Sequence, residues 1–296
     1  MKEEAYTLLE QYLDYLEIEK NRSRKTRENY SRYLLAFFED QKIRKLSHIT
    51  PEKVRNFRVH LSGKELKKNT QGYYVIAIRN FLKYLIKQGY ETLPPERIEL
   101  PKTSRRDIEV LDYRELERLI SAPEGETLRA LRDKAILETF FSTGLRLSEL
   151  CSLKRYIDLE RGEVSVRGKG DKLRVVFLSE GARKAIRKYL EKRTDPEEAL
   201  FASLSRSGNV IGRITPRSVE RLVDFYARAA GIPKKIHPHQ LRHSFATDLL
   251  INGADLRSVQ SLLGHANVST TQIYTHLTNK ELRDIHKAFH GRRRKE

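Results

Sequence analysis

The sequence predicts a mainly α-helical protein of two domains: an N-terminal helical bundle and a mostly helical second domain with one small antiparallel β-sheet. Three observations lead to this fold class. Apolar residues recur at helical spacing from residue 6 to about 93, a proline-rich segment then interrupts the pattern, and strand-like alternation follows once. A chain of 296 residues suits two domains of ordinary size, each with its own apolar core.

The N-terminal domain, residues 1–93, is expected to contain four or five helices. Its apolar residues recur every three or four positions, as in Tyr6, Leu9, Tyr12, Leu13, Leu16 and in Tyr30, Tyr33, Leu34, Phe37, Phe38. Helix-start signals, each a polar residue ahead of a helical run, agree with this spacing: Ser23, Thr50 with Pro51, and Asn69-Thr70. This half therefore reads as a helical bundle.

Residues 94–107 are predicted to form an extended linker. Three prolines lie between residues 94 and 101, no apolar period is sustained, and the segment ends in cations. A basic linker suits a clamp that passes beside a DNA backbone, and it also suits an ordinary solvated connector. Both interpretations are compatible with the sequence.

The second domain, residues 108–296, begins with helical patterns at 112–121 and 127–143. Val164 and Val166, and then Val175 and Phe177, alternate on either side of a Gly-Lys-Gly-Asp turn, which predicts a β-hairpin. Helices are expected to resume at Ser179 and to continue to the end of the chain. A polar loop at 203–209 and the segment Gly231-Ile-Pro233 interrupt them.

Composition favours a polyanionic partner. The chain has 58 Lys and Arg against 40 Asp and Glu, a formal net charge of +18, and charge alone does not decide that the partner is nucleic acid. The single cysteine, Cys151, lies in an apolar helical pattern, so a buried thiol in a reducing cytoplasm is expected. No apolar run approaches the roughly 20 residues of a membrane span, so we expect a cytoplasmic protein without a membrane partner.

Three segments of the second domain carry residues suited to phosphodiester chemistry: Thr143-Gly-Leu-Arg146-Leu-Ser-Glu-Leu, His239-Gln-Leu-Arg242-His, and Gly264-His265 through Tyr274 to His276. Cleaving DNA without a metal requires a nucleophile, neutralisation of the nonbridging oxygens and a proton for the leaving oxygen. Arginine suits the second task because its planar fork binds phosphate oxygens bidentately and keeps its charge.

Local patterns predict how these residues are presented. Arg146 should lie near a helix terminus, because glycine ends one helix before it and Ser148-Glu149 favours the start of another. Pro238 should open a helix whose first turn places His239 and Arg242 on one face. The histidines have no accompanying cysteines and no recognised ligand set, so neither a metal nor another cofactor is expected.

Together the three segments resemble the active-site boxes of the tyrosine recombinases, the phage integrase family, and most closely its Xer type. The resemblance extends along nearly the whole chain and implies a core-binding, SAM-like N-terminal domain followed by a tyrosine-recombinase catalytic domain. It implies that Tyr274 is the nucleophile and that four residues surround the phosphate, namely Arg146, His239, Arg242 and His265. His243 is expected to be a supporting residue. Lys169 at the hairpin tip resembles the lysine that protonates the departing 5′ oxygen, with Lys172 as the rival.

The resemblance also implies DNA contacts outside the catalytic boxes. Lys and Arg on the helix faces of the N-terminal domain, and one arginine of the second domain, are candidate phosphate contacts: Lys25, Arg27, Lys68, Arg79 and Arg217.

The function implied is site-specific recombination of double-stranded DNA through a 3′-phosphotyrosyl bond and a Holliday junction, without metal or ATP. Two domains would close around the duplex as a C-shaped clamp, and four protomers would assemble on two sites, with an accessory protein as a candidate activator. The segment 279–289 is amphipathic and would dock on a neighbouring protomer or pack within its own chain.

Chromosome dimer resolution is favoured, with integration or excision of a mobile element as the alternative. Two further alternatives remain open. A type IB topoisomerase would use the same phosphate chemistry and religate the same strand. A non-enzymatic regulator would use residues 256–271 as a helix-turn-helix.

Overall fold

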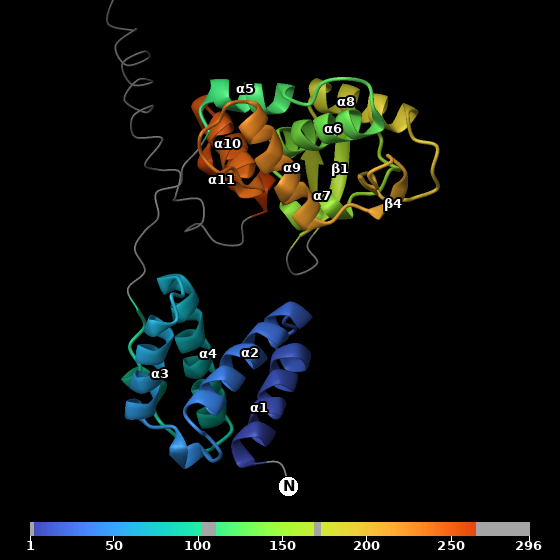
Figure 1. The fold of residues 1–296 in the computed structure, drawn as a ribbon. Helices are drawn as coiled ribbons and strands as arrows, with labels where there is room; N and C mark the ends of the chain where they lie inside the picture. Colours follow the sequence, from blue (N-terminus) through green and yellow to red (C-terminus); the bar gives the residue numbers. More distant parts are fainter. Residues whose placement is uncertain (1–2, 102–110, 169–172, 265–296) are drawn as a thin grey trace, which may run out of the picture. The chain divides into compact units, whose positions relative to one another are not determined.

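A computed structural model describes residues 3–101, 111–168 and 173–264 of the chain. Its backbone contacts divide the chain between residues 106 and 107 into two compact units (Figure 1). Both units are mainly helical, as predicted.

The N-terminal unit contains four α-helices: α1 (Glu4–Asp14), α2 (Arg24–Asp40), α3 (Pro51–Gly63) and α4 (Lys68–Lys87). Three short helical segments accompany them: a π-helical turn at Tyr15–Glu19 and two 3₁₀ turns at Leu46–His48 and Pro95–Arg97. Helix α4 packs against α1, α2 and α3, so it holds this unit together.

Side-chain caps set the starts of two of these helices. The Ser23 hydroxyl accepts a hydrogen bond from the backbone N–H of Thr26, and Thr50 caps α3 with Pro51 in its first turn. Both starts were predicted. Helix α4 instead begins ahead of the predicted signal, directly after Lys67, which makes no side-chain cap.

The core of the N-terminal unit is aromatic and extends past the end of α4. Its largest fully buried side chains are Tyr12, Phe37, Phe38, Phe57 and Phe81. Leu93 and Ile98, which lie on either side of Pro94 and Pro95, are buried in the same core. The segment expected to be a linker therefore begins with residues that pack on this unit.

The second unit is built around α6 (Leu128–Thr143), which packs against α5 (Tyr113–Ser121), α8 (Glu180–Glu191) and α10 (Pro238–Ile251) (Figure 1). The other helices among its described residues are α7 (Leu147–Ser152), α9 (Pro216–Ala229) and α11 (Leu256–Leu263). Helix α11 packs on α10 and forms with it a small apolar cluster of its own. These two helices and the end of α6 position the candidate site.

The predicted hairpin is present as β1 (Glu163–Arg167) paired antiparallel with β2 (Leu173–Phe177). Val164 and Val176 are register partners and both point into the core. A second antiparallel pair, β3 (Ala202–Leu204) with β4 (Val210–Arg213), flanks the predicted polar loop, whose residues 205–209 form the turn between the two strands. The expectation of a single small sheet was therefore wrong. The two strands are too short to show an alternation of apolar and polar residues, and the turn between them is rich in serine, so no strand was predicted here.

Among the described residues no helix combines the length and the apolar character needed to cross a membrane. Cys151 is buried as predicted, and burial raises the pKa of its thiol to about 11.

Candidate active site

The junction between α6 and α7 presents Arg146. Gly144 ends α6 in the left-handed region with φ of +57°, and Arg146 is the N-cap residue of α7, as the sequence predicted. A side chain at position 144 would overlap the ring of Phe245 on α10. Glycine is therefore needed here for both its conformation and its size.

Arg242 joins three segments of the unit. Pro238 opens α10 as predicted, and Arg242 lies one turn later with only 5% of its surface exposed. Its guanidinium donates to the backbone carbonyl of Gly144, and Nη2 donates to the carbonyl of Leu263 at 2.7 Å. Arg242 thus connects α10 with the ends of α6 and α11.

Two further arginines donate to the same helix end. Nη2 of Arg146 donates to the carbonyl of Gly264 at 3.0 Å. Nε of Arg174, from β2, donates to the carbonyl of Leu262 at 3.1 Å. Three consecutive carbonyls at the C-terminus of α11 therefore each accept a bond from a different arginine.

This arginine cluster, Arg146, Arg174 and Arg242, has a clear electrostatic basis. The last carbonyls of a helix have no partner within the helix and carry the negative end of its dipole, so cations are stabilised there. The carbonyls of residues 262–264 supply that environment and fix the three guanidinium groups relative to one another. The two arginines expected to bind phosphate, Arg146 and Arg242, are brought together by it.

Glu149 is the carboxylate of this cluster and is only 4% exposed. Its Oε1 accepts from Nη1 of Arg146 and from Nη1 of Arg174, both at 2.8 Å. Its Oε2 accepts from Nη2 of Arg174 at 2.7 Å and from the backbone N–H of Arg146 at 2.8 Å. Two of the three arginines bind this carboxylate, and one anion against three cations leaves the cluster a positive charge that would attract an anion.

Hydrogen bonding controls the charge of Glu149. Burial alone would raise the pKa of its carboxyl, but the bonds from Arg174 and Arg146 outweigh burial and lower the pKa to about 2, against an ordinary value of 4.5. The carboxyl is therefore ionised at any pH near neutrality.

This lowered pKa predicts a pH-dependent stability. Because the folded pKa lies below the unfolded one, the stabilisation is complete above about pH 5 and disappears as the pH falls toward 2. Between pH 6 and pH 3, wild type should lose roughly 2 kcal/mol more unfolding free energy than Glu149→Gln. Urea unfolding at both pH values measures this double difference, and equal losses in the two proteins would contradict it.

The histidines of α10 differ in their surroundings. His239 is exposed in the first turn, on the Arg242 side of the helix. His243 is half-buried, and burial, followed by the charges of His239 and Arg242, lowers its pKa to about 4. It is therefore neutral near pH 7, which fits the supporting role expected for it. No three His, Cys, Asp or Glu side chains gather as a metal site within the described ranges.

Three of the predicted catalytic residues, Lys169, His265 and Tyr274, lie outside the described residues, as does Lys172. The described part of the chain reaches Gly264, whose carbonyl accepts from Arg146, one residue before His265.

Sequence reasoning missed Arg174 and Glu149 as site residues. Arg174 had a signal only through the register of the hairpin, which pairs it with the buried Val166. The alternation of Val175 and Phe177 favoured those two residues for the buried face of β2, and both are exposed. A charged residue on the buried face of a strand requires a partner. Glu149 had a weaker signal, its position three residues after an N-cap, which favours a glutamate in any helix.

The cations proposed to contact DNA have varied partners. On α2, Lys25 pairs with Glu28 at 3.1 Å. Arg27 lies within ion-pair distance of three carboxylates, those of Glu10, Asp14 and Glu17. Its charge is compensated within the protein, so it is a weaker candidate than an unpaired cation.

The other three candidates lie on α4 and α9. Lys68 is exposed at the start of α4, and Arg217 is exposed in the first turn of α9. Arg79 is partly buried and donates to the carbonyl of Ile98 at 2.9 Å, so it anchors the segment after α4. The exposed pair are the better placed to meet a phosphate.

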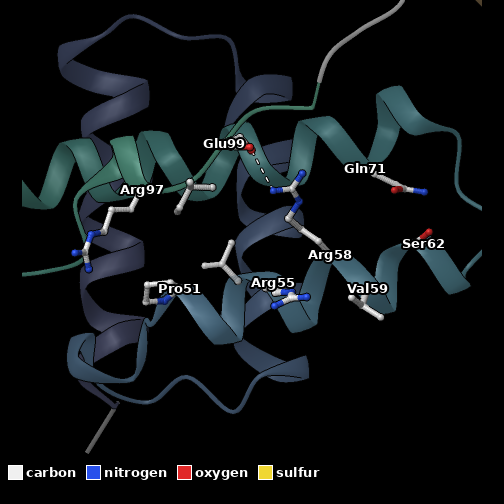
Figure 2. A pocket seen from close by; sticks show the side chains of 10 residues that line it. Pro51, Arg55, Arg58, Val59, Ser62, Gln71, Arg97 and Glu99 are labelled. Carbon is white, nitrogen blue, oxygen red and sulfur yellow. Dashed lines mark hydrogen bonds between the residues drawn. The ribbon is translucent and has the colours of Figure 1, made fainter.

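A further group of arginines lines a shallow pocket of the N-terminal unit, between α3, the start of α4 and residues 97–99 (Figure 2). Arg55, Arg58 and Arg97 line it, and Nη1 of Arg58 donates to the carbonyl of Glu99 at 3.2 Å. Within the described ranges these arginines form no ion pair with a carboxylate. No motif in the sequence marks them as a site.

Comparison with known proteins identifies the family. Residues 109–281 match the model of the phage integrase family, and residues 9–89 match that of its N-terminal SAM-like domain. The chain belongs to the phage integrase family. The recombinase is of the Xer type, as its three boxes indicated.

Individual relatives align with nearly the whole length of the recombinase. Tyrosine recombinase XerC of Thermodesulfovibrio yellowstonii is 37% identical over 285 residues, which is 94% of each chain. Tyrosine recombinase XerD of Listeria monocytogenes is 36% identical over 296 residues, 96% of this chain and 99% of that protein. The crystal structure of XerH site-specific recombinase bound to palindromic difH substrate, a post-cleavage complex, aligns with a TM-score of 0.72 at 25% identity, over 94% of this chain and 82% of the other.

Proposed function

We propose that this chain is a site-specific DNA recombinase that cleaves and rejoins duplex DNA through a 3′-phosphotyrosyl bond to Tyr274. One observation carries the proposal. Arg146 and Arg242, which the sequence assigns to one phosphate, donate to adjacent carbonyls at the end of α11, directly before His265. A site that gathers arginines and a single buried carboxylate is suited to a phosphodiester.

In the proposed reaction the two arginines bind the nonbridging oxygens and neutralise the charge that develops on them. The phenol of Tyr274 releases its proton to the surrounding water as its oxygen attacks phosphorus, and the bond from phosphorus to the 5′ oxygen breaks. That oxygen takes a proton from Lys169, with Lys172 as the alternative donor, while His239 and His265 contact the phosphate. The 5′ hydroxyl of the partner strand then reverses these steps, and no metal or ATP is consumed.

The present hydrogen bonds of Arg146 leave room for this role. A guanidinium has five N–H donors, and Arg146 uses one terminal nitrogen for Glu149 and the other for Gly264. Its side chain is 29% exposed, so a phosphate can approach it without displacing the carboxylate behind it.

The proposed setting is the resolution of chromosome dimers in the cytoplasm, by a homotetramer on two sites, with an accessory protein as activator. The support is that relatives named XerC and XerD align with nearly the whole chain. Two domains would close around each duplex as a C-shaped clamp, with Lys25, Lys68 and Arg217 among the phosphate contacts.

A two-site strand-exchange assay tests the function. One labelled and one unlabelled duplex, each carrying the dimer-resolution site of the source chromosome, are incubated with the recombinase. We expect recombinant duplexes and a Holliday junction that contains both DNAs. In a parallel assay on a supercoiled plasmid, relaxation without strand exchange between the duplexes would indicate a topoisomerase. Specific binding of the duplexes without cleavage would indicate a regulator.

A further inference from the structure

Arg174 differs from Arg146 in how completely the protein holds its guanidinium group. All three of its guanidinium nitrogens donate to protein groups: Nη1 and Nη2 to the two oxygens of Glu149 at 2.8 and 2.7 Å, and Nε to the carbonyl of Leu262 at 3.1 Å. A bidentate fork with a third bond fixes both the position and the plane of the group.

Burial also separates Arg174 from Arg146. The side chain of Arg174 is 11% exposed and that of Glu149 is 4% exposed, whereas that of Arg146 is 29% exposed. Arg174 is therefore less accessible to a phosphate than Arg146, and Glu149 offsets its charge. This arrangement suits a group that orients Glu149 and Arg146.

Two connections lead from Arg174 into the site. Glu149 Oε1 accepts from both Arg174 and Arg146, so the group that holds the carboxylate also sets the position of the Arg146 fork. The bond to Leu262 holds the end of α11, where an added Cβ at Gly264 would lie 3.0 Å from Arg174 Cδ. The chain continues from Gly264 toward the proposed nucleophile.

We infer that Arg174 is a positioning residue for strand cleavage: through Glu149 and the end of α11, it aligns the phosphate-binding arginines with the segment that carries Tyr274. The inference rests on the proposed function and adds a residue to it. Arg174 touches neither DNA nor the reacting atoms in this account. Its loss is expected to slow cleavage while DNA affinity is retained.

Arg174→Gln and Arg174→Lys, measured beside wild type, test the inference. We expect Arg174→Gln to slow single-turnover cleavage of a nicked suicide duplex about 100-fold, the scale of a misalignment near 1 Å. Lysine keeps the charge and loses the fork, so Arg174→Lys should recover about a tenth of the wild-type rate. Affinity for the intact duplex should stay within about twofold, with an unchanged salt slope, because no phosphate contact is lost.

Arg132→Gln is the matched structural control. Arg132 is an arginine of the same unit whose side chain is 7% exposed, against 11% for Arg174, and its guanidinium donates to the carboxylate of Asp133 and the carbonyl of Ala202. It should lose stability as Arg174→Gln does and cleave at the wild-type rate. All rates are taken well below each variant's Tm, so only folded protein is compared.

A pH profile adds a readout that a purely structural role would not move. Without Arg174, Glu149 loses two of its bonds, so the cleavage rate of Arg174→Gln should fall more steeply than that of wild type as the pH drops from 7 to 5. Should Arg174→Gln fail to fold, Arg174→Lys carries the same comparison.

The outcomes are distinct. Cleavage by both Arg174 variants at the rate of Arg132→Gln would overturn the inference and leave the proposed function intact. A parallel loss of affinity with a reduced salt slope would make Arg174 a phosphate contact and also overturn it. Absence of cleavage by wild type would contradict the proposed function itself.

Discussion

Replacing Tyr274 with phenylalanine should abolish the covalent protein–DNA adduct while leaving DNA affinity almost unchanged. The change removes the phenolic oxygen and keeps the ring. The groups that bind DNA therefore remain, and only the nucleophile is lost. The measurement is a denaturing gel after incubation with a nicked suicide duplex, on which wild type should show a band of retarded mobility.

The control for this prediction is Tyr113→Phe. Tyr113 is one of 14 tyrosines in the chain, lies in the same unit and is 60% exposed, so its hydroxyl is accessible but unconnected with the arginine cluster. This variant should form the adduct at the wild-type rate. An adduct that persists in Tyr274→Phe would place the nucleophile elsewhere.

Replacing Arg242 with glutamine should lower the cleavage rate by about 10³-fold, the usual scale for losing a charged donor to a transition-state oxygen. It should also reduce stability by about 1–3 kcal/mol, because the carbonyls of Gly144 and Leu263 lose their donor in a buried setting. Single-turnover cleavage and thermal unfolding measure the two effects separately.

Arg228→Gln is the control, because Arg228 forms an exposed ion pair with Asp224 on α9 and should change neither property by much. Arg242→Lys keeps the charge but cannot span the carbonyls and a phosphate together, so it should still lose about 100-fold in rate. Cleavage by Arg242→Gln at the wild-type rate would remove Arg242 from the proposed phosphate site.

Local signals predicted most of the elements that present the site. The caps at Ser23 and Thr50, which start two helices of the N-terminal unit, act within a few residues of chain. So do the two signals that present the site, glycine at the end of α6 and proline at the start of α10. The placement of Arg146 and Arg242 at helix starts follows from them. The short strands β3 and β4 escaped because three or four residues are too few for a periodicity to emerge.

Tertiary partners could not be predicted in the same way. Nothing near Arg174 in the sequence indicates that it meets Glu149, 25 residues away, or the end of α11, 88 residues away. The same limit applies to Arg79, whose partner is the carbonyl of Ile98. From the sequence, a basic residue on a helix face predicts only a positive charge. Whether DNA or another group of the protein pairs with that charge depends on tertiary packing.

The most direct test of the central claim is to identify the tyrosine that carries DNA. The trapped complex is digested with nuclease and protease, and mass spectrometry locates the modified peptide. The account predicts a nucleotide joined through its 3′ phosphate to Tyr274, in the peptide that follows Gly264-His265. A nucleotide on any other residue, or one attached through a 5′ phosphate, would contradict it.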